Sequence, residues 1–327
     1  MKKIDWSTYK FRASQTSKLL VGKIEFVEEI DEQIKELINK RDVLVHENKR
    51  LKWTETNESD LKKLIEKKKT PIFKRLPKTM TNELRKIHRS ETFERDFSFT
   101  NKYVEKGNME EENAISLYQS YRKKVLGEKN TFFLNNKKRV SNEWISGEVD
   151  LTDTNDVENC NEGFDIKCSW ELDTFPYPED DLGTIYEAQN QSYMWLTGAE
   201  KWTTAYCLVN TNEHLLHREK EKWRYTLGYH KIDATMSDKQ REKIEKLVSD
   251  KMRELEIRYI YDYDKFTNDN SGHLLEISRG EWYEKGYDIP LKSRIVEKVS
   301  TRNESLIEDL KERIKISREY LSFLDSL

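Results

Sequence analysis

The sequence predicts an α/β protein in which helices flank one sheet, and three observations support this prediction. Residues 163–170 alternate apolar and polar side chains, as in a half-buried strand, and 201–209 also form a strand pattern. Helical patterns lie beside them, at 109–124 and 185–196. A chain of 327 residues, 35% of them hydrophobic, has room for one large core with an elaboration, or for two domains. The middle of the chain therefore has the order helix, three strands, helix, strand.

The residues before this core are expected to be helical. Residues 9–20 are predicted to form a short helix behind a serine cap. Apolar side chains recur every three or four residues over 27–51, which predicts a long helix that needs a partner. We favour an intramolecular hairpin with a helix at 61–69 over a dimeric coiled coil. Two prolines then interrupt the pattern, which resumes over 79–89.

The elements of the core follow one another closely. After Gly107 we expect a helix at 109–124, strands at 132–134, 142–151 and 163–170, an acidic loop at 173–182, a helix at 185–196 and a strand at 201–209. A polar stretch without a predicted element comes next. Two capping boxes, Ser237 with Gln240 and Thr301 with Glu304, then predict a helix at 238–258 and a final helix.

Charge is strongly segregated along the chain, although the formal net charge is only −3. Residues 61–90 carry eleven Lys or Arg against two Glu, a local charge of +9, so the remainder sums to −12. From Glu148 to Asp181 there are twelve acidic residues and one basic residue, Lys167. A basic segment beside an acidic pocket suits a metal-dependent enzyme that acts on a polyanion. A solvated helical face is the alternative interpretation of the basic segment.

Several classes of protein are not indicated. No apolar run reaches the roughly 18 residues of a membrane span, and no apolar segment follows the first residues as in a signal peptide. Three cysteines without a CxxC pair favour a reducing cytoplasm and give no structural zinc site. The GxxxxGK[ST] phosphate loop of ATP-driven motors is absent from the sequence. We therefore expect a cytoplasmic protein with no membrane partner.

The acidic region places three ionisable groups where they can meet. Side chains two apart on a strand share a face, so Asp165 and Lys167 point the same way. Asp150, at the end of the preceding predicted strand, can join them. Two carboxylates can hold a hard divalent cation on oxygen ligands, and the ammonium can act beside a nucleophilic water. Asp-x-Lys alone is common, and a surface strand is the alternative interpretation of that pair.

The order of several features is more specific than any one of them. An acid begins the first core helix, an acid and an acid-x-Lys pair follow on strands, and a Gln-x-x-x-Tyr pair lies on one face of the next helix. These residues are Glu111, Asp150, Asp165, Lys167, Gln189 and Tyr193. This order resembles the PD-(D/E)XK nuclease superfamily. Glu110 and Glu112 flank Glu111, which we choose from its spacing from Gly107.

Within that superfamily, three segments are similar to the lambda-exonuclease and YqaJ-like phage recombination branch, namely 107–114, 147–150 and 186–194. The Arg12-Ala13-Ser14 opening resembles the phosphate-contacting N-terminal segment of that branch. Two departures bear on the likeness. Asp165 stands where this branch more often has Glu, and the residues between Leu20 and Glu105 are a longer helical insertion than lambda exonuclease suggests.

The resemblance implies a restriction-endonuclease-like core at 107–327, preceded by an N-terminal segment of the nuclease domain at 1–22 and a helical insertion at 23–106. It implies Mg²⁺, or Mn²⁺ as a substitute, with Glu111, Asp150, Asp165 and the Ile166 carbonyl as ligands. Lys167, Gln189 and Tyr193 complete the implied catalytic set. The resemblance implies that Arg12 and Ser14 bind DNA phosphates. The charge of the basic segment indicates the same role for Lys67, Lys68, Lys69, Lys74 and Arg75.

The implied activity is that of a 5′→3′ exodeoxyribonuclease of phage DNA recombination or replication. Its implied partners are DNA, a single-strand annealing protein and further copies of the chain. Two alternatives stay open. One is a structure-specific endonuclease or Holliday-junction enzyme on the same core. The other is a non-catalytic DNA-binding protein, against which the presence of Asp150, Asp165 and Lys167 together argues.

Overall fold

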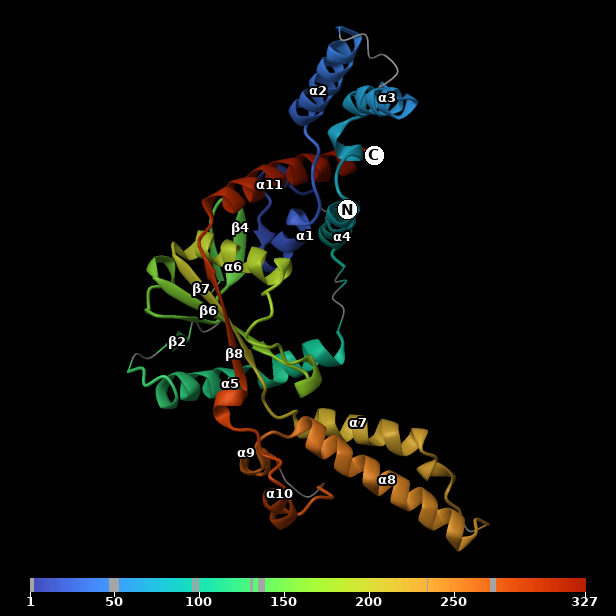
Figure 1. The fold of residues 1–327 in the computed structure, drawn as a ribbon. Coiled ribbons are helices and arrows are strands. Elements are labelled where there is room, and N and C mark those ends of the chain that lie inside the picture. The colour runs from blue at the N-terminus through green and yellow to red at the C-terminus, as the bar shows by residue number, and fades with distance from the viewer. Residues whose placement is uncertain are drawn as a thin grey trace. The chain divides into compact units, whose positions relative to one another are not determined.

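The structure, a computed structural model, describes residues 3–46, 53–95, 97, 100–129, 132–134, 139–233, 235–270 and 275–327. The chain folds into two compact units (Figure 1). The first unit comprises Met1–Phe97, Glu143–Ile145 and Glu304–Leu327, and the second comprises Ser98–Asn142 and Ser146–Asn303. The sequence-based division instead began the core at residue 107 and kept the final helix with it.

The first unit is helical. Its helices are α1 (Thr16–Leu20), α2 (Val27–His46), α3 (Glu55–Lys69), α4 (Lys78–Phe93) and α11 (Glu304–Asp325). Helix α2 packs against α3, which confirms the predicted intramolecular hairpin. Helix α11 packs against α1 and α4, so the C-terminal residues complete the unit that the N-terminal residues begin. These contacts group α11 with the N-terminal residues rather than with the sheet.

One prediction for this unit needs correction, and part of another concerns residues that the structure does not describe. The predicted helix at 9–20 is shorter, because Phe11 and Arg12 form strand β1 and α1 begins at Thr16. The Phe11 amide donates to the Trp144 carbonyl at 3.1 Å, so this segment is bonded as a strand rather than as a helical turn. The last two residues of the predicted 27–51 pattern, Asn48 and Leu51, lie outside the described residues.

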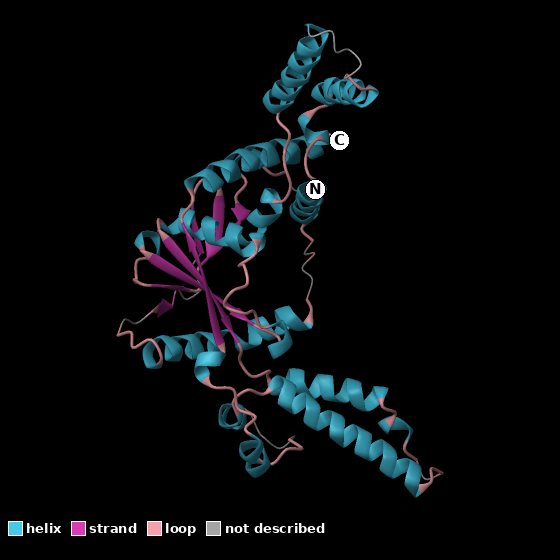
Figure 2. Cartoon of the chain, in the orientation of Figure 1, coloured by secondary structure: helices cyan, strands magenta, loops and turns pink. Residues whose placement is uncertain are grey.

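The second unit is built on a five-stranded mixed sheet (Figure 2). Its strands, in spatial order, are β2 (Phe133–Leu134), β5 (Leu151–Thr152), β6 (Glu162–Cys168), β7 (Lys201–Cys207) and β8 (Ile295–Thr301). Strands β6 and β7 are parallel, and the other neighbours are antiparallel. Helix α6 (Thr184–Thr197) connects β6 to β7, as a parallel pair requires. The prediction of a mixed α/β core is confirmed.

The predicted strand at 142–151 is present only in part, because it is interrupted. Residues 139–152 instead form three short strands, β3 (Arg139–Ser141), β4 (Ile145–Glu148) and β5. Strands β3 and β4 make a hairpin that pairs Val140 with Gly147. The chain then bends at Asp150, whose carboxylate accepts the Ile166 amide proton. Because a side chain takes this amide, the strand ladder is interrupted there, and β4 and β5 are separate.

Helix α5 (Lys102–Lys124) covers one face of the sheet. It begins seven residues before the predicted start. The Asn101 side chain is the N-cap there, because it accepts hydrogen bonds from the backbone amides of Tyr103 and Val104. Its apolar side chains and those of the sheet form the core, which includes Ala114, Ile115, Tyr118, Leu151, Phe164, Ile166, Ala205, Cys207 and Ile295. Alternation along β6 therefore leaves Asp165 and Lys167 on the opposite face.

A second core lies among α7 (Glu213–Thr226), α8 (Asp238–Tyr259), α9 (Tyr263–Asp269) and α10 (Arg279–Lys285). The Ser237–Gln240 capping box that predicted α8 is present. Helix α7 was predicted as a polar stretch, because only Leu215 and Leu216 of its first turns are buried apolar residues. A buried ion pair at 2.6 Å, between Lys220 and Glu256, joins α7 to α8. Packing and charge burial, rather than an apolar stripe, stabilise this helix.

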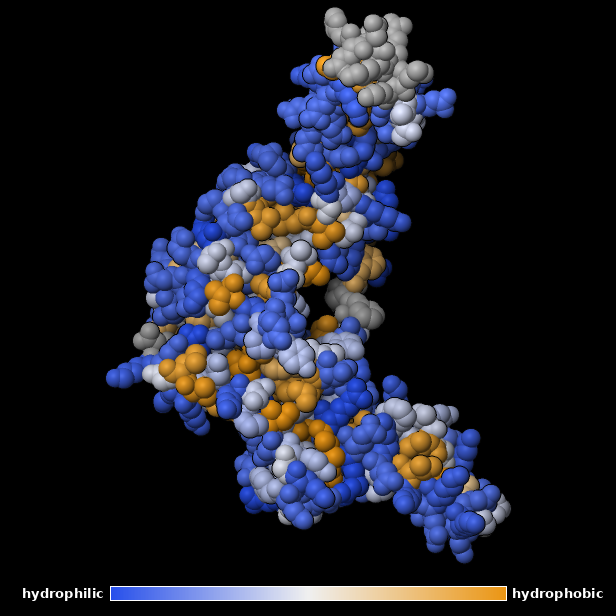
Figure 3. All heavy atoms as spheres, viewed as in Figure 1, coloured by the Kyte–Doolittle hydropathy of each residue, from blue (hydrophilic) through white to orange (hydrophobic). Residues whose placement is uncertain are grey.

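Polar and charged side chains cover most of the face shown in Figure 3. Among the described residues, no helix has the length and apolar character needed to cross a membrane. The apolar residues gather instead in the two cores of the second unit and under the helices of the first.

Candidate active site

Strand β6 presents Asp165 and Lys167 on one face, as predicted. The Lys167 Nζ atom lies 2.7 Å from Asp165 Oδ2, and the Asp165 side chain is only 4% exposed. In the parallel pairing with β7, Asp165 lies opposite Thr204 and Lys167 opposite Tyr206. The sheet thus fixes an acid and an ammonium side by side in a largely buried position.

Asp150 reaches this pair from the bend between β4 and β5. Its Oδ2 accepts the Ile166 amide proton at 2.8 Å, so the carboxylate is anchored to the residue between Asp165 and Lys167. Burial, followed by the charge of Asp165, raises the pKa of Asp150 to about 7, although the Ile166 amide and Lys167 act in the opposite direction. Two carboxylates that disfavour each other's charge are therefore held together here.

Lys167 is a stable cation in this arrangement. Burial by itself lowers the pKa of Lys167, but the charge and hydrogen bond of Asp165, together with the charge of Asp150, raise it above the usual value. The ammonium also lies 5.3 Å from the ring centre of Tyr186. Because Lys167 holds its proton, this geometry favours donation to an anion over acceptance of a proton from water.

Gln189 and Tyr193 lie on the face of α6 that meets β6, one helical turn apart. Gln189 Nε2 donates to Asp165 Oδ1 at 3.4 Å and to the Tyr193 hydroxyl at 3.2 Å. The Tyr193 ring stacks on Trp202, with ring centres 5.0 Å apart. Trp202 in turn covers Gly163, where a Cβ atom would lie only 2.2 Å from the Trp202 ring. Gly163 thus allows the close packing that positions Tyr193 and Gln189.

The structure separates Glu111 from its neighbour Glu110. The charge of Glu111 is the last of the causes that raise the pKa of Asp150, so Glu111 is near enough to act on that carboxylate. Glu110 is buried elsewhere, and its Oε2 accepts a hydrogen bond from Asn113 at 2.7 Å. Adjacent residues of a helix point about 100° apart, so only one of the two can face the pair. The spacing from Gly107 and this geometry both favour Glu111.

The donors near β6 fit a hard cation. Asp165 Oδ2 is buried, and the Lys167 ammonium 2.7 Å away already compensates its charge, so this oxygen faces a cation in the structure. Asp150 and Asp165 can supply carboxylate oxygens, and Ile166, which follows Asp165 and whose amide binds Asp150, can supply a backbone carbonyl. Within the described part of the chain, no group of three His, Cys, Asp or Glu side chains is arranged to hold a metal ion. A cation here would thus rest on two acids and a carbonyl, with Glu111 from α5 as a further candidate ligand.

The candidate DNA-binding residues all lie in the first unit. Arg12 and Ser14 are exposed on it, and so is Lys74. Arg75 instead bonds through its guanidinium to the Glu25 carbonyl. The three consecutive lysines have acidic partners: Lys67 pairs with Glu25, Lys68 with Asp31 at 2.5 Å, and Lys69 with Glu66 at 2.9 Å. Since all three lysines are more than a third exposed, these pairs are weak enough to be exchanged for phosphates.

We expect the triple variant Lys67→Glu/Lys68→Glu/Lys69→Glu to bind duplex DNA more weakly. The slope of log K against log salt should fall by about 0.9 for each DNA phosphate that the variant no longer binds. A Lys→Gln triple tests the removal of charge without new repulsion from Glu25, Asp31 and Glu66. The exposed α2 lysines Lys35 and Lys40, changed to Gln, serve as the control. An unchanged slope in both triple variants would support the alternative interpretation, in which the segment is a solvated helical face that only joins α2 to α3.

Two aromatic residues beside Lys167 were missed as site residues in the sequence analysis. Tyr186 lies one turn before Gln189 on α6, and Tyr206 is the partner of Lys167 in the β6–β7 pairing. Their rings make an edge-to-face contact with centres 6.0 Å apart. The helical spacing of Tyr186 from Gln189 could have indicated the first. The second depends on strand register, which the sequence does not specify.

Comparison with protein-family models and with curated proteins gave no match. Among solved structures, the chain is similar to a phage related exonuclease from Haemophilus somnus 129PT, with a TM-score of 0.55 and 20% sequence identity. The similarity covers 98% of this chain and 96% of that one. At this identity, the likeness is one of fold, and it extends over nearly the whole of both chains.

Proposed function

We propose that this chain is a Mg²⁺-dependent deoxyribonuclease with a PD-(D/E)XK site, acting as a 5′→3′ exonuclease in phage DNA recombination. The observation that carries the proposal is the buried Asp165–Lys167 pair on β6, with Asp150 anchored to the intervening amide. The order of helix, strands, helix and strand around it supports the proposal of a restriction-endonuclease-like core. The fold shared with a phage related exonuclease supports a nuclease role.

Mg²⁺, or Mn²⁺ in its place, would be held by Asp150, Asp165 and the Ile166 carbonyl, with Glu111 as a further ligand. When bound, the ion lowers the pKa of a water and offsets the charge that builds up on the scissile phosphate. The protein's part is to hold the two carboxylates in place. The Ile166 amide fixes Asp150, and Gln189 on α6 fixes Asp165.

Lys167 has a separate role in the proposed reaction. As a cation beside the carboxylates, it donates to a phosphate oxygen or to the attacking water and stabilises negative charge as it develops. The Tyr186 ring limits the positions of the ammonium, and Tyr206, the strand partner of Lys167, holds that ring by an edge-to-face contact. Tyr193 supports this arrangement indirectly, since its hydroxyl accepts a hydrogen bond from Gln189 and its ring packs on Trp202.

A structure-specific endonuclease or Holliday-junction enzyme is the second candidate, because exonucleases and endonucleases of this type share their catalytic residues. Two features favour the exonuclease. The Arg12-Ala13-Ser14 opening offers a guanidinium and a hydroxyl that suit a terminal phosphate. The structural neighbour is also described as an exonuclease.

The choice between them is tested with DNA that has or lacks ends. With Mg²⁺ present, we expect linear duplex with a 5′-phosphate to be degraded faster than the 5′-hydroxyl form, and covalently closed circular duplex to survive. Arg12→Ala should remove the preference for the 5′-phosphate. A chelator should stop degradation in every case. Early appearance of nicked or linearised circles would favour the endonuclease instead, and degradation that survives exhaustive chelation would exclude the proposed metal site.

A further inference from the structure

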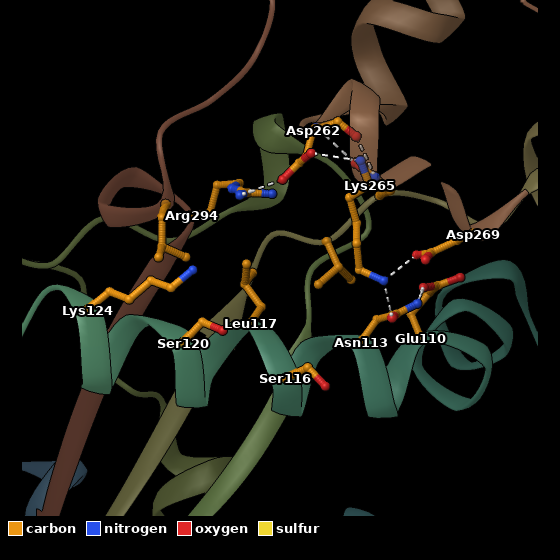
Figure 4. Close-up of a pocket in the computed structure, with 13 residues that line it drawn as sticks. Glu110, Asn113, Ser116, Leu117, Ser120, Lys124, Asp262, Lys265, Asp269 and Arg294 are labelled. Atoms are coloured by element: carbon orange, nitrogen blue, oxygen red, sulfur yellow. Dashed lines mark hydrogen bonds and ion pairs between the residues drawn. The ribbon is translucent and has the colours of Figure 1, made fainter. Parts of the chain in front are cut away.

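A pocket of about 270 Å³ lies between α5 and the segments that follow β7 and precede β8 (Figure 4). Its floor is one stripe of α5, formed by Glu110, Asn113, Ser116, Leu117, Ser120 and Lys124. Residues at these spacings share one face of a helix. The pocket shares no lining residue with the candidate active site, so its occupant would be bound separately.

One end of the pocket offers hydrogen-bond donors that have no acceptor. Lys124 has no ion pair, and the Ser120 hydroxyl no hydrogen bond, with any residue that the structure describes. Arg294 is only 7% exposed and binds Asp262 at 3.1 Å through one terminal nitrogen. Its Nε is buried and has no hydrogen-bond acceptor within the described part of the chain. A buried donor without an acceptor costs free energy, which a bound anion would recover.

The charged and polar side chains at the other end of the pocket are already paired with one another. Lys265 pairs with Asp269 and donates to Asn113 Oδ1 at 3.0 Å. The Asn113 amide donates to Glu110 Oε2 at 2.7 Å. These groups appear opposite the Lys124 end in Figure 4. Lys124 and Asn113 are eleven residues apart, which is about 16 Å along a helix. Asp262 also lines the pocket, but Arg294 already pairs with it. One anionic group is therefore favoured at the Lys124 end, while Glu110 and Asp269 at the far end would repel a second.

Between the two ends the lining is apolar. Leu117 on α5, Val209 after β7 and Leu291 before β8 supply it. Such a wall suits the flat face of a ring. The space is about 270 Å³. This space and the single anionic end favour a small molecule over a nucleic-acid strand, which brings one phosphate per nucleotide.

We propose that this pocket binds a nucleoside monophosphate, with its phosphate on Lys124, Ser120 and Arg294 Nε and its base against Leu117 and Val209. The oxygens of a phosphate monoester match these donors in number, and charge-assisted bonds to them are strong. The proposal does not rest on the nuclease function, because it uses none of the residues of that site.

The test is calorimetric titration of the full chain with dAMP in the presence of EDTA, which removes metal-dependent phosphate binding at β6. Lys124→Met should weaken dAMP binding at least about tenfold, and Ser120→Ala should weaken it less. The matched control is Lys123→Met, which removes an equally exposed lysine that does not line the pocket. Asp165→Asn should bind dAMP as the wild type does.

Two further ligands separate the parts of the proposal. Deoxyadenosine should bind at least about tenfold more weakly than dAMP, since it lacks the phosphate. Inorganic phosphate should also bind more weakly, since it lacks the base. Failure of dAMP to bind, or equal binding to Lys124→Met and wild type, would overturn the site. Equal affinity for inorganic phosphate and dAMP would overturn the assignment of the apolar wall to a base.

Discussion

Replacing Asp165 by Asn or Lys167 by Met is expected to lower the rate of DNA cleavage by at least about a thousandfold. Asp165 contributes a carboxylate that Gln189 and Lys167 both hold in place, and Asn cannot supply its charge. Lys167 supplies a positive charge in a largely buried position, where one well-placed donor is worth roughly 10²–10³ in rate. The measurement is single-turnover degradation of end-labelled duplex with excess enzyme.

The design must separate a chemical effect from a loss of folding. Lys167→Met leaves the Asp165 carboxylate buried without its cation, which is destabilising. The double variant Asp165→Asn/Lys167→Met removes both charges, and should regain the stability of the fold but not the activity. Lys201→Met is the matched control, because Lys201 is an ion-paired lysine of the neighbouring strand β7. Wild-type rates in either folded single variant would rule out the assigned site.

The sequence predicted the elements that carry a strong local pattern. Alternation over β6 placed Asp165 and Lys167 on one face, and the ion pair between them confirms it. The bounds of α6 and β7 agree with the predicted 185–196 and 201–209 to within two residues at each end. In these segments burial on one face and local propensity favour the same structure.

The elements that the sequence did not predict depend on contacts between distant residues. The bend at Asp150 is stabilised by a hydrogen bond to Ile166, sixteen residues away, and nothing in 142–151 signals it. Helix α7 is stabilised by packing on α8 and by the buried Lys220–Glu256 pair, so its own sequence looks like a polar stretch. The grouping of α11 with the first unit likewise rests on packing against α1 and α4.

The candidate site shows the same division. Residue types and order indicated Asp150, Asp165, Lys167 and Gln189, but not which atoms they contact. Gln189 was expected as a member of the catalytic set, and the structure bonds it to Asp165 and Tyr193. Lys167 was expected to act beside a nucleophilic water. Its raised pKa favours orienting that water over deprotonating it, and one cause, the Asp165 carboxylate at 2.7 Å, is visible only in three dimensions.

The second large effect concerns Asp150. With Mg²⁺ absent, we expect Asp150→Asn to raise the free energy of unfolding at pH 8 by about 2 kcal/mol while abolishing cleavage. One pKa unit corresponds to about 1.4 kcal/mol, and burial with the charge of Asp165 raises the pKa of Asp150 from 3.8 to about 7. The expected gain is set below the full value because protein and solvent relax around a buried charge and reduce its cost. Asn can still accept the Ile166 amide proton, so the bend should persist.

The sign of the pH dependence follows from proton binding. Between pH 3.8 and about 7, folded Asp150 holds its proton more often than the unfolded chain does, so the wild type loses stability as the pH rises through this window. The variant lacks that loss, so its advantage should be small near pH 4 and full at pH 8, as measured by urea unfolding in EDTA. Asp181→Asn, at an exposed loop residue, controls for a general change in charge.

Mg²⁺ added at pH 8 should stabilise the wild type but not Asp150→Asn, because the ion binds the ionised carboxylates of the folded state. An Asp150→Asn variant no more stable than the wild type at pH 8 would show that burial beside Asp165 does not destabilise the ionised Asp150 carboxylate.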